Sequence, residues 1–87
     1  MRPEVLLVWL RAQPFRPFRI HLTNGSSFDV RHPELVLLER SYLTIGSPAA
    51  DLPGTVDRTD MIGLLHINHI EPLPVPPPAG NGAGQPA

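Results

Sequence analysis

The sequence predicts a small, mainly β domain that starts with one short helix and is followed by a disordered tail. From residue 18 onward, apolar and polar side chains alternate in short segments, which is the period of a half-buried strand. A proline-led apolar stretch near the N-terminus has helical spacing instead. The last 14 residues hold five of the 12 prolines and almost nothing suited to a core. We therefore expect one domain over residues 1–73 and a disordered Pro/Gly/Ala-rich tail over residues 74–87.

Composition limits the size of the domain and excludes several chemistries. A chain of 87 residues holds one domain, and domains of this size often gain stability by oligomerising. All seven basic residues are arginine, which excludes a Schiff-base lysine and a P-loop lysine. The chain has no cysteine, which excludes disulfides, thiolate nucleophiles and cysteine-bound zinc. A net charge of −1 gives no broad electrostatic footprint for nucleic acid or an anionic membrane.

The first element is a helix that begins at Pro3 and ends before Pro14. Proline suits the first helical turn, and the Glu4 carboxylate complements the helix dipole there. Apolar residues recur at helical spacing, and the sides of the helix between them are largely apolar too. We therefore expect this helix to be covered on more than one face, by the core or by a partner.

The next two segments predict a β-hairpin with a defined register. Residues 18–22 and 27–31 alternate, and Asn24-Gly25 lies between them. A two-residue turn would place apolar and polar side chains on the same face, so we expect a three-residue loop over residues 23–25 with Gly25 in the left-handed conformation. The predicted cross-strand pairs are Phe18 with Val30, Arg19 with Asp29, and Ile20 with Phe28.

The remaining strands are predicted from apolar runs and breaks between them. Pro33 interrupts the chain after the hairpin because proline cannot donate to a ladder. We expect a strand buried on both faces at residues 35–38, a strand at 41–45, a long loop at 46–59, a strand at 61–67 and a short last strand at 69–73. Gly63, inside the 61–67 run, indicates a bulge or a close backbone approach.

This order of parts resembles the Sm-like variety of SH3-like barrels, which implies a five-stranded small β-barrel after the helix. The hairpin segment Pro14-Phe15-Arg16-Pro17-Phe18-Arg19-Ile20-His21-Leu22 with its Asn24-Gly25 turn, His32-Pro33-Glu34, and Leu65-His66-Ile67 through Glu71-Pro72 also resemble a group of small uncharacterised bacterial proteins. The resemblance implies a shape and no mechanism. Residues 27–31 lack the glycine of the Sm signature, and its RNA-binding Asp and Asn have no clear counterparts, so RNA binding is not implied.

Two histidines are the candidate metal ligands. His66 and His69 stand three residues apart, a spacing that faces one side of a helix or turn but not of a straight strand, and His21 and His32 are available from elsewhere. The interpretation that we favour is an ordinary turn with hydrogen-bonded or solvated imidazoles. We accordingly expect no cofactor, and a small metal-binding protein that uses these histidines stays an alternative function.

An arginine face is the candidate nucleic-acid site. Arg16, Arg19 and Arg31, with His21 near them, are expected on the outer face of the hairpin, where they would hold phosphates. Asp29 lies among them and is expected to neutralise Arg19, which favours an ordinary solvated sheet surface. Nucleic-acid binding therefore stays an alternative function.

A non-enzymatic binding module is the function that we favour. No hydroxyl or carboxylate stands in a catalytic motif, so we expect no enzyme. No export signal or membrane-spanning stretch is present, so we expect a cytoplasmic protein without a membrane partner. The chain has more apolar residues than one face of a small sheet can bury, which suggests a homo-oligomer or a protein partner. The alternative is that the helix caps the barrel and buries all of them. The interface candidates are Leu6, Trp9, Leu10, Met61, Ile62, Leu64 and Leu65.

Overall fold

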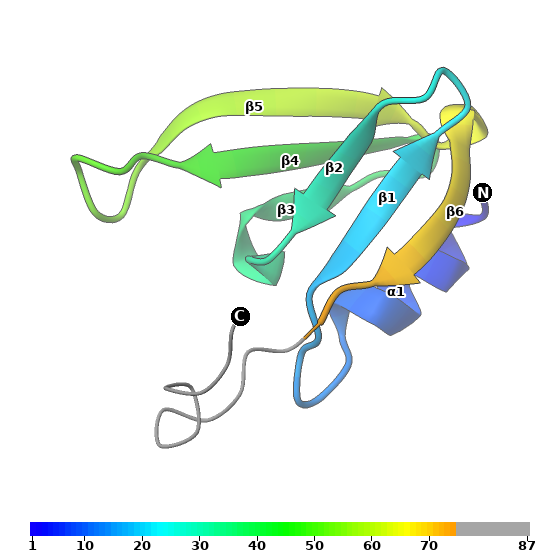
Figure 1. Ribbon diagram of the computed structural model, residues 1–87, viewed down its shortest axis with the longest axis horizontal. Helices are drawn as coiled ribbons and strands as arrows, with labels where there is room; N and C mark the ends of the chain where they lie inside the picture. The colour runs from blue at the N-terminus through cyan, green and yellow to red at the C-terminus, as the bar shows by residue number, and fades with distance from the viewer. Residues whose placement is uncertain (75–87) are drawn as a thin grey trace.

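The computed structural model describes residues 1–74 and shows one N-terminal helix and two three-stranded antiparallel sheets (Figure 1). The strand orders are β2-β1-β6 and β3-β4-β5. The elements are α1 (Pro3–Leu10), β1 (Phe18–Leu22), β2 (Ser27–Val30), the 3₁₀ turn η1 (Pro33–Leu35), β3 (Val36–Leu38), β4 (Tyr42–Pro48), β5 (Val56–Gly63), the 3₁₀ turn η2 (Leu64–His66) and β6 (Ile67–Pro72). Apart from Pro74, the predicted disordered tail lies outside the described residues.

The β1–β2 hairpin has the register that the sequence predicts. Phe18 pairs with Val30, Arg19 with Asp29, and Ile20 with Phe28. In the turn, Gly25 has φ +92° and its N–H donates to the Leu22 carbonyl at 3.0 Å, which confirms the left-handed glycine. The Asn24 side chain accepts a hydrogen bond from the Ser26 N–H at 2.9 Å, so it stabilises the same turn.

The strands do not form the closed five-stranded barrel that was expected. Six strands form two separate sheets, where the resemblance implied five strands in one barrel. Because proline cannot donate to a ladder, the chain folds into η1 between β2 and β3, and these strands join different sheets. The prediction that residues 35–38 are buried on both faces is also wrong, because Leu37 is mostly exposed.

Much of the predicted loop over residues 46–59 is instead a β-hairpin. Strands β4 and β5 are paired along their length, from Tyr42 opposite Gly63 to Pro48 opposite Val56. Their far end forms an arm that extends beyond the other strands (Figure 1). A side chain at Gly46 would crowd this hairpin, since its Cβ would lie 3.1 Å from Val56 Cγ1. Glycine thus permits close packing within a strand here, where composition suggested a break.

The predicted strand over residues 61–67 divides into the end of β5, the turn η2 and the start of β6. The irregularity between β4 and β5 lies at Ser47/Pro48 and not at Gly63, so the predicted bulge at Gly63 is wrong. The close neighbour of Gly63 is a side chain: a Cβ there would lie 3.2 Å from His66 Cδ2. Absence of a side chain at Gly63 therefore lets the chain turn back on itself at η2.

A bulge in β6 places two residues on opposite faces of the sheet, although a straight strand would place them on the same face. Ile67 is buried, whereas His69 two residues later is exposed. The register against β1 shifts between His21, which pairs with His69, and Leu22, which pairs with Ile67, so Asn68 is the extra residue. The bulge allows Ile67 to join the core while His69 stays on the outer surface.

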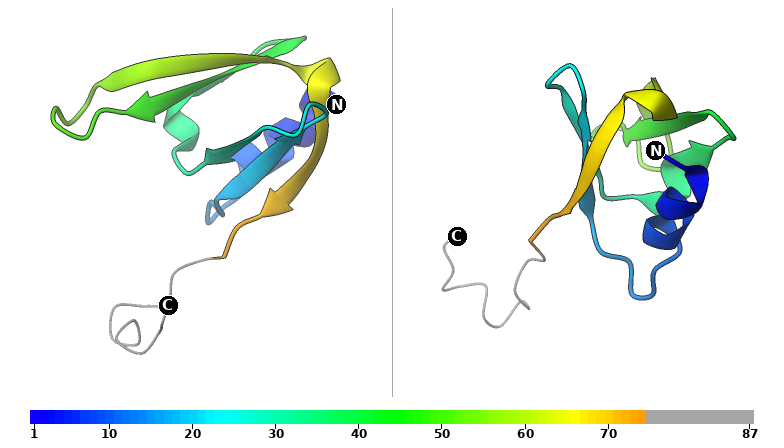
Figure 2. Two further views of the ribbon diagram at one scale, coloured as in Figure 1. Left: turned by 45° about the horizontal axis from the view of Figure 1, so that its top comes forward. Right: turned by 90° about the vertical axis from the view of Figure 1, so that its right-hand side faces the viewer.

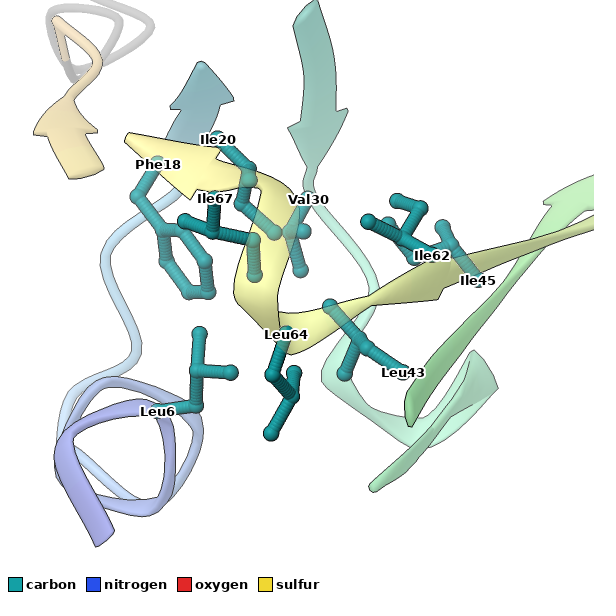
Figure 3. Packing of buried hydrophobic residues seen from close by; sticks show 9 residues of the cluster. All are labelled: Leu6, Phe18, Ile20, Val30, Leu43, Ile45, Ile62, Leu64 and Ile67. Carbon is teal, nitrogen blue, oxygen red and sulfur yellow. The ribbon is translucent and has the colours of Figure 1, made fainter. Parts of the chain in front are cut away.

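The core lies between the two sheets and α1 (Figures 2 and 3). Leu6 is fully buried and reaches from the helix into a cluster of strand residues, while the Trp9 ring packs 5.4 Å from the Phe18 ring. The helix therefore covers the open side of the sheets. The buried cluster comprises Leu6, Phe18, Ile20, Val30, Leu43, Ile45, Ile62, Leu64 and Ile67.

Candidate functional site

The structure divides the predicted interface residues into two groups. Leu6, Ile62 and Leu64 are buried in the core, which leaves them no surface for a partner. Trp9 and Leu10 are half-buried and pack against the same core. Met61 and Leu65 remain, and both are largely exposed. Any interface between this chain and a partner that uses the predicted apolar residues therefore centres on the sheet β3-β4-β5 and the adjacent turn η2.

Two exposed apolar residues that the sequence analysis missed extend this surface. The register places Leu37 and Met61 on either side of Thr44, and Tyr42, two residues before Thr44, lies on the same face of the sheet. We call Leu37, Tyr42, Met61 and Leu65 the outer apolar face. The exposed fractions are 69% for Leu37, 48% for Tyr42, 65% for Met61 and 89% for Leu65.

A hollow borders the outer apolar face, next to Tyr42 and Leu65. Its volume is about 350 Å³, and Tyr42 and Leu65 contribute apolar atoms to its lining. Gly63 also lines it, and the missing side chain there keeps the space beside the Tyr42 ring open. Arg40 and His66 line the hollow too, so its lining combines apolar and polar groups. Protein interfaces also combine the two.

Of the predicted arginine face, the structure brings Arg19 and Arg31 together, with Asp29 between them. Arg19 Nε donates to Asp29 Oδ1 at 2.7 Å, and Arg31 Nη2 lies 3.5 Å from Asp29 Oδ2, which confirms that Asp29 neutralises Arg19. The hydrogen bond from Arg19 holds the pKa of the Asp29 carboxyl below its usual value and raises the pKa of the guanidinium. Arg16 is exposed on the segment before β1. Glu71 lies opposite Arg19 in the register, so Asp29 and Glu71 together offset two of the three arginine charges.

The histidines form a different group from the one predicted. His69 pairs with His21 across β1 and β6, and their rings stack with centroids 4.2 Å apart and planes 10° apart. His21 Nε2 lies 2.8 Å from Glu71 Oε1, and this hydrogen bond lowers the pKa of Glu71. His66 lies in η2 against Gly63. Within residues 1–74, no three His, Cys, Asp or Glu side chains are placed to hold one metal ion.

Of the residues that were missed, Tyr42 had a detectable signal in the sequence. Leu37 had none, because residues 35–38 are all apolar and a continuous apolar run does not show which side chains face outward. Tyr42 follows a tight turn, where an aromatic residue on a strand often packs across to its neighbours. Glu71 gave no local signal, because its contact with His21 depends on the pairing of the first and last strands.

Comparisons with protein-family models, with curated proteins and with solved structures found no match for this chain. None of the helices in residues 1–74 has the length and hydropathy needed to cross a bilayer.

Proposed function

We propose that this chain is a non-enzymatic binding module that associates with a second copy of itself through the outer apolar face. The observation that carries the proposal is the grouping of Leu37, Tyr42 and Met61 on one face of the sheet β3-β4-β5, with Leu65 beside Tyr42 at the hollow. All four side chains are exposed. Isolated surface hydrophobic residues are ordinary, whereas a contiguous group with a polar rim marks an interaction site.

A second copy suits this surface for two physical reasons. Outer faces of two sheets pack about 10 Å apart, so a two-fold related copy would bury the same four side chains on both sides. A domain of this length has a small core and gains stability from such burial. Tyr42 is of the residue type enriched in the buried centres of interfaces.

We also infer that the fold is an opened relative of the Sm-like small barrels. The support is the short connection between β2 and β3, which consists of Arg31, His32 and the turn η1. Without the interruption at Pro33, one bent strand would replace these two. Five strands would then remain, as the resemblance implies. The inference concerns shape and carries no activity.

The test is the solution mass by light scattering across protein concentration, for the wild type and for Met61→Glu and Leu37→Glu. We expect a wild-type dimer and an increase of its dissociation constant by about tenfold or more in each variant, because a charge would be buried at the interface. Val8→Glu is the matched control, since Val8 is 72% exposed but lies on the helix.

Either of two results would contradict self-association through this face. One is a wild-type monomer at every concentration, and the other is equal dissociation by Val8→Glu and Met61→Glu. The ratio of absorbance at 260 and 280 nm in the same peak tests the arginine face. Nucleic acid in that peak, lost on raising the salt concentration, would favour the alternative function.

A further inference from the structure

We propose that His21 and His69 form a chelating site for a late first-row divalent metal ion, the class that includes Cu²⁺, Ni²⁺ and Zn²⁺. Imidazole nitrogen is a preferred ligand of these ions. The two histidines lie on β1 and β6, so a bound ion would join the first and last strands of the domain. The site lies on the other sheet from the outer apolar face and does not depend on self-association.

The strand register brings the two imidazoles within reach of one ion. His21 and His69 are direct cross-strand partners, and their ring centroids are 4.2 Å apart. Opposite residues have Cβ atoms about 4.5–5.5 Å apart, a separation that two metal–nitrogen bonds of about 2.0–2.1 Å can span. The stacked rings must open to direct a nitrogen of each at the ion, and the soft χ2 torsion of histidine permits this rotation.

Glu71 prepares His21 to act as a ligand. An ionised carboxylate only accepts hydrogen bonds, so at the 2.8 Å contact the Nε2–H of His21 is the donor. In a neutral imidazole the other nitrogen then holds the lone pair, which leaves Nδ1 of His21 free to bind an ion. Carboxylate–histidine–metal arrangements of this kind fix the tautomer and raise the basicity of the ligand.

The bulge at Asn68 is what places the second ligand. In a straight strand His69 would share the face of Ile67, which is buried, whereas the register shift turns His69 outward beside His21. Since no cluster of three such side chains occurs in residues 1–74, the site offers two imidazoles and leaves the other coordination positions to water. We therefore expect one exchangeable ion per chain.

The experiment is a calorimetric titration of the metal-free protein with Cu²⁺, the ion that nitrogen sites of this kind bind most tightly. We expect one site per chain in the wild type. His21→Asn and His69→Asn should each weaken binding by about a hundredfold, because the second imidazole of a chelate binds at a high effective concentration. Electron paramagnetic resonance of the copper-loaded protein should show two imidazole nitrogens in the wild type and fewer in either variant.

His32→Asn is the matched control. His32 also has a carboxylate neighbour, with Glu34 Oε2 3.6 Å from its Nδ1, but it is not one of the stacked histidines. We expect His32→Asn to bind Cu²⁺ as the wild type does. Circular dichroism checks that each variant is folded before metal is added. A wild type without a stoichiometric site, or equal weakening by His32→Asn and His21→Asn, would overturn the proposal.

Discussion

Replacing Leu6 by alanine tests whether α1 belongs to the core or to an interface. Leu6 is fully buried, so Leu6→Ala removes apolar contacts and leaves a cavity, at a cost of about 2–5 kcal/mol in the free energy of unfolding. A stability of about 0.05–0.15 kcal/mol per residue gives about 4–11 kcal/mol for the 74 described residues. The substitution therefore removes a large fraction of the free energy of unfolding, and some of the variant molecules should be unfolded at room temperature.

The assay is urea unfolding followed by Trp9 fluorescence and by circular dichroism, at several protein concentrations. Trp9 is the single tryptophan and packs on Phe18, so its emission reports detachment of the helix. Val8→Ala is the control on the same helix, and because Val8 is largely exposed its effect should stay within about 0.5 kcal/mol. A loss for Leu6→Ala no greater than that for Val8→Ala would refute the assignment of Leu6 to the core.

Three further outcomes are expected in the same unfolding assay. Gly25→Ala should cost about 1–2 kcal/mol because Gly25 has φ +92°, and Gly25→Asn should cost less; equal costs would contradict the strain argument. The bond from Arg19 lowers the pKa of Asp29 in the folded state, so its contribution is present above the usual value of 3.8 and is lost as the pH falls through the folded value. Asp29→Asn should therefore flatten the acid limb of a stability–pH curve, and an unchanged limb would exclude this linkage. Gly46→Ala should destabilise by about 1–3 kcal/mol through contact with Val56 Cγ1, and Val56→Ala should relieve part of that loss, whereas strictly additive losses would show no contact.

The hairpin of β1 and β2 could be predicted to the level of its register because two independent constraints agreed. Alternation fixes which residues face the core, and only one loop length also places Arg19 opposite Asp29. Both constraints are local, within residues 18–30. The predicted neutralisation of Arg19 followed from the same register, so this part of the candidate site was accessible from sequence.

The β4–β5 hairpin was missed because its outer part buries almost nothing. Residues 51–59 are exposed, so selection for a core imposes no apolar alternation on them. Pro48 and Gly54 are residue types common in loops and therefore suggested one long loop. In the structure Pro48 ends a strand and Gly54, with φ +89°, lies in the turn of the hairpin. A strand that lies outside the core carries little of the signal by which strands are recognised.

The histidine pair and the outer apolar face depended on contacts that no local pattern contains. His21 meets His69 only because β1 pairs with β6 and because a bulge reverses the alternation at Asn68. A continuous apolar run likewise does not state which residues face outward, so exposed Met61 and buried Ile62 appeared equivalent. Topology, which is decided by the whole chain, separates them.

The exposed end of the β4–β5 hairpin gives the molecule a segment whose length is free to change. Because residues 51–59 are exposed and lie outside the core cluster, the amide hydrogens there should exchange with solvent long before those of β1, through fraying that leaves the core intact. Insertions at the tip near Gly54 should be tolerated for the same reason. Chains with this fold can therefore lengthen or shorten the hairpin and alter what it reaches, at little cost to folding.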